Sequence, residues 1–163
     1  MRTILRALTV VSAAASVLLL GSISTAAGNS TSGSVEITTT IDFSSFPFKG
    51  TFAVVTGEAL LGCSGGSFMD TPMSGLTVLS HSAKERDLLC TSGQNSGSSF
   101  SIVFQPTPPI VGGTSSSGHW QVLPGASGPY ANMTGGGDFS VTVPAPNSFI
   151  GHEDLTGTVQ FTP

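Results

Sequence analysis

Hydrophobic and polar residues alternate along several short segments of the chain. In 35–43 the odd positions carry Val, Ile, Thr and Phe, whereas the even positions carry Glu, Thr and Asp. The same alternation recurs in 99–105, 137–143 and 154–162. A period of two predicts strands that bury one face and expose the other.

Further strands are expected at 50–58, 76–82, 86–91 and 119–123, with a short extended piece at 130–133. Segments rich in Gly, Ser and Pro separate them, and 62–75 and 111–118 are interpreted as loops. The charged run Lys-Glu-Arg-Asp at 84–87 is interpreted as a solvated turn. We find no segment with a helical period after the N-terminal region, so the pattern predicts an all-β sandwich or barrel.

The N-terminal region has the organisation of a secretory signal peptide. Arg2 and Arg6 precede an apolar run over 7–20, and small residues lead to Ala26 and Ala27. This order predicts cleavage after one of these two alanines. The alternative is a membrane anchor, but the run is shorter than the roughly 20 residues needed to cross a bilayer.

The expected organisation is a signal peptide over 1–27, a flexible lead-in over 28–34 and one β domain over 35–163. Charged residues make up only 9% of the chain, against about 25% in ordinary soluble proteins, which argues against a helical bundle with a charged surface. Without the leader, three basic residues remain against nine acidic ones, a formal charge of −6. This balance argues against a nucleic-acid partner and against polybasic attachment to lipid, and the sequence predicts no membrane insertion of the mature chain.

The two cysteines, Cys63 and Cys90, both lie in the part expected to be exported. In an oxidising compartment such a pair predicts a disulfide, worth roughly 3–4 kcal/mol in the chain-entropy estimate. The alternative, a redox or metal site, lacks a Cys-x-x-Cys motif and a histidine at ligand spacing.

The region after residue 119 carries an ordered set of aromatic and glycine residues. The set comprises Trp120, Val122, Gly125, Gly128, Tyr130, Ala131, Met133, Gly135, Gly137 and Phe139. It resembles the late motif of the allene oxide cyclase and dirigent-like barrel superfamily, and more closely its secreted bacterial members. Asn132 and Met133 depart from the Gly-Leu that this family favours. The resemblance implies an antiparallel β-barrel of about eight strands.

Trp120 and Tyr130 are the only Trp and Tyr in the chain. One interpretation places them in the core, with each polar tip hydrogen-bonded. The other places them in a ligand-binding cavity at the mouth of the barrel. The sequence favours the core, and both residues are kept as candidate ligand-binding residues.

Few residues are candidates for acid–base chemistry. Glu36 lies opposite the apolar face of its strand, so we expect it to be exposed. The run His152-Glu153-Asp154 is interpreted as an exposed polar patch in a turn, in which only His152 and Asp154 share a face. The sequence shows no nucleophile elbow, no phosphate loop and no metal-site spacing, so neither a catalytic residue nor a cofactor is predicted.

These observations predict a secreted or periplasmic barrel that binds a small apolar or aromatic molecule or has a structural role, without catalysis. A cyclase or isomerase of the allene oxide cyclase type and a protein–protein interaction module are the alternatives. The expected assembly is a monomer or a small homo-oligomer.

Overall fold

The structure is a computed structural model that describes residues 30–72, 84–107, 115–142 and 147–163. Strands dominate these ranges. In chain order the elements are β1 (Thr31–Asp42), β2 (Lys49–Thr56), α1 (Glu58–Leu61), β3 (Gly65–Pro72), β4 (Lys84–Ser92), β5 (Ser99–Thr107), β6 (Ser115–Val122), the 3-10 turn η1 (Gly128–Tyr130), β7 (Met133–Thr142) and β8 (Ile150–Phe161).

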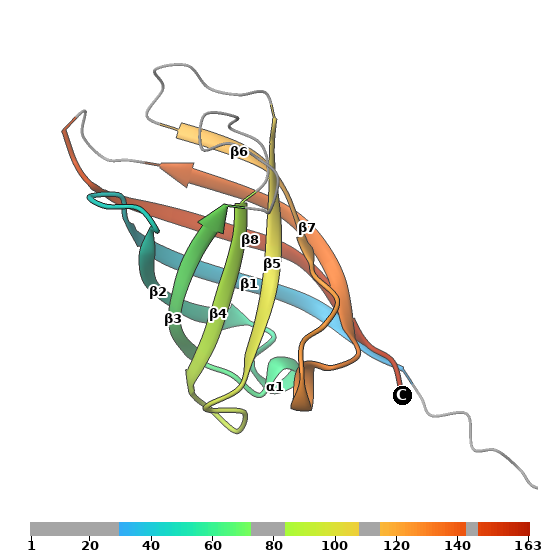
Figure 1. Cartoon of the computed structure of the whole chain (residues 1–163). Helices are drawn as coiled ribbons and strands as arrows, with labels where there is room; N and C mark the ends of the chain where they lie inside the picture. The colour runs from blue at the N-terminus through green and yellow to red at the C-terminus, as the bar shows by residue number, and fades with distance from the viewer. Residues whose placement is uncertain (1–29, 73–83, 108–114, 143–146) are drawn as a thin grey trace, which may run out of the picture.

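The eight strands form one closed barrel. Each strand is antiparallel and hydrogen-bonded to the next, and β8 pairs with β1 to complete the circle (Figure 1). The closing pair runs from Thr31 opposite Phe161 to Asp42 opposite Ile150. The predicted all-β barrel of about eight strands is therefore confirmed, and closure excludes the alternative sandwich, which would keep two separate sheets.

Strand β1 begins four residues earlier than the hydrophobic alternation predicts. Residues 31–34, which were expected to belong to a flexible lead-in, pair with β8 from Phe161 to Thr158. Their side chains are polar, but backbone pairing does not require apolar side chains. Residues 1–29, including the expected signal peptide, lie outside the described ranges, as does the strand expected at 76–82.

Three predictions about the middle of the chain are wrong. The expected loop at 111–118 overlaps β6, which begins at Ser115. The expected loop at 62–75 contains β3, and the expected solvated turn at 84–87 is the beginning of β4. Strands β3 and β4 pair with each other from Gly65 opposite Ser92 to Pro72 opposite Lys84, and with β2 and β5 on their other sides. Ladder hydrogen bonds on both sides therefore hold a polar, glycine-rich sequence in an extended form.

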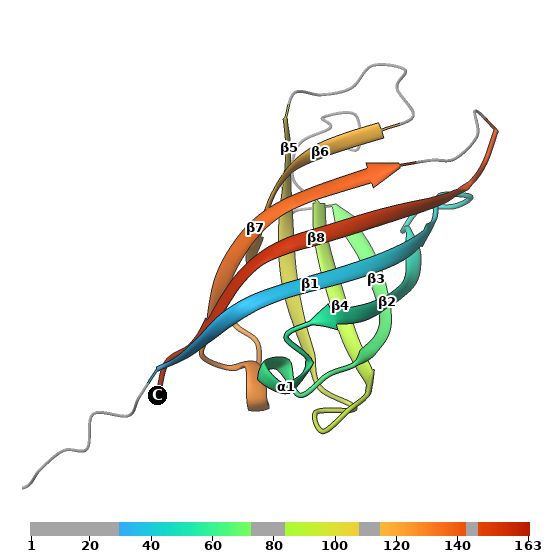
Figure 2. The same cartoon turned by 180° about the vertical axis from the view of Figure 1, so that it is seen from behind.

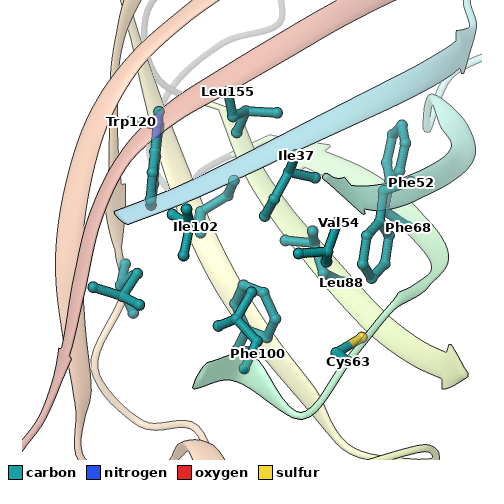
Figure 3. Close-up of a cluster of buried hydrophobic side chains, with 14 of the residues drawn as sticks. Ile37, Phe52, Val54, Cys63, Phe68, Leu88, Phe100, Ile102, Trp120 and Leu155 are labelled. Atoms are coloured by element: carbon teal, nitrogen blue, oxygen red, sulfur yellow. The ribbon is translucent and has the colours of Figure 1, made fainter. Parts of the chain in front are cut away.

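The inward faces of all eight strands supply one apolar core. Figure 3 shows part of it, with Ile37, Leu88 and Leu155 among the labelled side chains. The buried core residues are Val35, Ile37, Ile41, Phe52, Val54, Leu61, Cys63, Phe68, Leu88, Cys90, Phe100, Ile102, Phe104, Trp120, Val122, Tyr130, Met133, Phe139, Leu155 and Val159.

Glycine permits a close approach of strands β7 and β8. A Cβ atom added to Gly137 would lie 1.9 Å from the carbonyl oxygen of Thr156. No side chain fits there without moving the backbone, so the glycines of β7 are explained by the tight coiling of the barrel.

One end of the barrel is closed by irregular structure, and we call it the α1 end. Helix α1 and the turn between β4 and β5 lie together at this end (Figure 2). The Cys63–Cys90 disulfide, with Cα atoms 5.9 Å apart, joins the segment after α1 to β4 and confirms the predicted pair. In the described part of the chain, no helix is long and apolar enough to cross a membrane.

Candidate functional site

Three charged side chains enter the barrel near the end opposite α1. They are Asp70 of β3, Arg86 of β4 and Glu153 of β8, and their exposed fractions are 1%, 2% and 4%. Each lies on the inward face because strand alternation places it in line with buried neighbours, such as Leu88 and Leu155. We call these three residues the charged cluster and this end of the barrel the charged end.

Arg86 binds both carboxylates at once. Its Nε donates to Asp70 Oδ1 at 2.6 Å and its Nη2 donates to Asp70 Oδ2 at 2.9 Å. Its Nη1 donates to Glu153 Oε2, which also accepts a hydrogen bond from the Thr39 hydroxyl at 3.3 Å. The two parallel bonds to Asp70 form the bidentate geometry that guanidinium and carboxylate favour.

Two aromatic rings pack against the Arg86 guanidinium. Its Cζ atom lies 4.0 Å from the ring centroid of Phe68 and 4.5 Å from that of Phe104. Phe104 in turn packs edge-to-face on Phe139, with the centroids 5.1 Å apart. The cation–π contacts and the bonds in the guanidinium plane fix the position of Arg86.

Opposing effects act on the pKa of the Glu153 carboxyl. Burial raises the pKa of the Glu153 carboxyl above its ordinary value. The charge and hydrogen bond of Arg86 act in the opposite direction, while the negative charge of Asp70 raises the pKa further. Burial alone would lower the pKa of Arg86, but its two carboxylate partners raise it, so the guanidinium stays charged.

We therefore expect a distinctive pH dependence of stability. The folded carboxyl of Glu153 holds its proton to a higher pH than the unfolded one, whose pKa is near 4.5. Unfolding then releases a proton, and the free energy of unfolding falls as the pH rises between these two pKa values, by at most about 1.4 kcal/mol per pH unit. Urea unfolding measured from pH 4 to 8 should show that the free energy of unfolding falls less in Glu153→Gln than in the wild type. Asp138→Asn should show the same fall as the wild type. Equal slopes in the wild type and Glu153→Gln would contradict this expectation.

One carboxyl oxygen of Glu153 is available to a bound molecule. The hydrogen bonds from Arg86 and Thr39 both end on Oε2. Among the described residues, no hydrogen bond found in the structure ends on Oε1. This oxygen can accept a hydrogen bond from a ligand, or donate one when protonated.

The structure places the two candidate ligand-binding residues in the core. Trp120 donates from Nε1 to the Thr156 carbonyl at 3.1 Å, and the Tyr130 hydroxyl donates to the Leu61 carbonyl at 3.1 Å. Tyr130 belongs to the α1 end and packs on Phe100, with the ring centroids 4.9 Å apart. Neither residue contacts the charged cluster through a hydrogen bond in the described structure.

The other acid–base candidates lie mostly on the outer face. Glu36 is half-buried there and accepts a bond from the Thr56 hydroxyl at 3.4 Å. His119 and Asp138 form an exposed pair, with Nδ1 and Oδ1 2.6 Å apart. His152 is also exposed. In the described ranges, no group of three or more His, Cys, Asp or Glu residues could hold a metal ion.

The interpretation of His152-Glu153-Asp154 as a turn is wrong, and the expected exposure is wrong for Glu153. These residues belong to β8, which begins at Ile150. His152 and Asp154 face outward together, as strand alternation predicts, while Glu153 faces the interior.

Shallow hollows mark the outer surface of the barrel. One hollow of about 400 Å³ lies over β5, β6 and β7 and is bordered by Gln105, His119, Gln121 and Asp138. Its floor is formed by the glycines of β7, which the coiling of the barrel already explains. We therefore place the candidate site at the charged end, where polar and aromatic groups converge.

Sequence reasoning missed the charged cluster. Asp70 lies in a segment interpreted as a loop, and Arg86 lies in one interpreted as a turn. The available signal was the spacing of Arg86, Leu88 and Cys90, which share one strand face. Four consecutive charged residues at 84–87 hid that pattern.

The fold and the site together define a closed antiparallel barrel with a buried arginine–carboxylate cluster at one end. Comparison with models of protein families, with curated proteins and with solved structures finds no match.

Proposed function

We propose that this chain is an exported barrel that binds a small apolar or aromatic molecule at the charged end without catalysing a reaction. The observation that carries the proposal is the burial of Asp70, Arg86 and Glu153 together in an otherwise apolar barrel. Replacing a buried ion pair by apolar side chains of the same volume often leaves a protein equally or more stable. A buried charged cluster at one end is therefore better explained by recognition.

The surroundings of the cluster fit such a ligand. Small-molecule sites are mostly apolar and carry a few polar groups that orient the ligand. Here the apolar part is provided by Phe68, Phe104 and Phe139, and the polar part by Glu153 Oε1.

Export forms part of the proposal. The disulfide between Cys63 and Cys90 is consistent with an oxidising compartment. The leader expected over 1–27 would deliver the chain to the periplasm or the extracellular space.

The test uses two neutral probes, 4-methylphenol and 4-methylcyclohexanol, added to the full chain after export and purification. Isothermal titration calorimetry should show saturable binding of at least one probe, at one site per chain. Glu153→Gln should weaken binding about tenfold, because an amide nitrogen at the Oε1 position neither accepts the probe hydroxyl, as a carboxylate does, nor donates to it as strongly as a protonated carboxyl does.

A matched control removes one carboxylate from the outer face. Asp138→Asn should bind both probes as the wild type does, since Asp138 is exposed. If neither probe binds, or if both variants weaken binding equally, the proposal is wrong.

An isomerase or cyclase is the second candidate, and one observation favours it. Burial raises the pKa of the Glu153 carboxyl, so this group keeps its proton to a higher pH than an exposed carboxyl and suits the role of a proton donor. Turnover of an allylic epoxide that is lost in Glu153→Gln and kept in Asp138→Asn would support this candidate over simple binding.

A further inference from the structure

Among the described residues near the charged end, Phe43 follows the last residue of β1 and is partly buried against the core. Gly151 of β8 is buried on the same face as Glu153. A Cβ atom added to Gly151 would lie 2.5 Å from Phe43 Cε2. The Phe43 ring therefore lies against Gly151 inside the barrel, two residues along β8 from Glu153.

Phe43 has contacts within its own hairpin loop and with the beginning of β8. Its ring packs edge-to-face on Phe48, with centroids 5.0 Å apart, and Phe48 packs on Phe46 at 5.3 Å. The backbone N–H of Phe43 donates to the Phe149 carbonyl at 2.7 Å. Since Phe43 lies beyond the end of β1, its side chain can move without breaking the pairs of that strand.

The same loop is joined to the charged cluster. The backbone N–H of Asp70 donates to the Phe48 carbonyl at 2.7 Å. A movement of the loop therefore shifts the backbone of Asp70, which forms the bidentate pair with Arg86.

We infer that Phe43 occupies the position of the ligand's ring and thereby selects a molecule with a single aromatic ring and a hydroxyl directed at Glu153 Oε1. This inference rests on the proposed function. A planar ring suits this position because Gly151 presents no side chain to it. The ring of an aromatic ligand can make the contacts that the Phe43 ring makes, so no cavity remains when the ligand displaces Phe43.

Exposed apolar side chains near Phe43 can pack against its ring after displacement. Phe46, Phe149 and Ile150 are 43%, 61% and 42% exposed. The turn after β1 and the beginning of β8 lie side by side at one corner of the barrel (Figures 1 and 2). Phe43 can therefore leave the interior without exposing its ring entirely to water.

The decisive measurement is NMR on the wild-type full chain. Without a probe, a nuclear Overhauser effect should connect the Phe43 ring protons to the Gly151 α-protons. Saturation with 4-methylphenol should abolish that effect. If 4-methylphenol binds and the effect persists, the inference is wrong and the proposed function stands; if no probe binds, the proposed function itself fails.

A variant gives a second readout. Phe43→Ala should bind 4-methylphenol at least tenfold more tightly than the wild type, because no ring has to be displaced. It should prefer this probe over 4-methylcyclohexanol. Adding Glu153→Gln to Phe43→Ala should remove about tenfold of the affinity.

The matched control is Phe161→Ala. Phe161 is also partly buried against the core, but it lies at the far end of β8 from Gly151. If Phe161→Ala binds 4-methylphenol, adding Glu153→Gln should leave that affinity unchanged. If Phe43→Ala gains no affinity, or if its gain does not depend on Glu153, Phe43 does not occupy the ligand position.

Discussion

Replacing Arg86 by methionine should lower the free energy of unfolding at pH 7 by about 3–5 kcal/mol, which is the usual cost of removing one partner from a buried ion pair. The substitution leaves Asp70 and Glu153 buried without their cation. It also removes the contacts of the guanidinium with two aromatic rings. Urea unfolding followed by circular dichroism measures this loss.

Two controls separate this effect from a general loss of positive charge. Lys49 is exposed, so Lys49→Met should change stability by less than about 0.5 kcal/mol. Combining Arg86→Met with Asp70→Leu and Glu153→Leu removes all three charges and should cost less than Arg86→Met alone. Equal stability losses in Arg86→Met and Lys49→Met would show that Arg86 is not buried as described.

Removing the disulfide should have the second large effect on stability. Cys63 and Cys90 are 27 residues apart, and closing a loop of this length contributes roughly 3–4 kcal/mol in the chain-entropy estimate. The double substitution of both cysteines by alanine should lower the free energy of unfolding by about this amount. Both residues are buried, so alanine avoids introducing a buried hydroxyl.

Reduction gives an independent measure of the same bond. Dithiothreitol should destabilise the wild type and leave the double alanine variant unchanged. If the reductant affects both proteins alike, or if the double variant is as stable as the oxidised wild type, the disulfide does not stabilise the barrel.

The barrel could be predicted from the sequence because its physical cause is local. Alternation in 99–105 and 154–162 marks strands whose inner faces avoid water, and that pattern needs no knowledge of the partner strand. The disulfide could be predicted for a similar reason, since a chain with two cysteines allows a single intramolecular pair.

The site could not be predicted because its cause is long-range. Arg86 is stable inside the barrel only because Asp70 lies opposite it on β3 and Glu153 reaches it from β8. That second contact joins residues 67 positions apart in the chain. Read alone, a charged segment such as 84–87 favours solvent, and only the closed sheet supplies the partners that reverse this preference.

The most direct test of the account is a crystal structure of the chain with 4-methylphenol. We expect the Arg86 guanidinium against Phe68 and Phe104, and the probe hydroxyl within hydrogen-bond distance of Glu153 Oε1. The probe ring should lie on Gly151, where Phe43 lies without ligand. Electron density for the probe at another site, or an Arg86 side chain directed into solvent, would contradict the account.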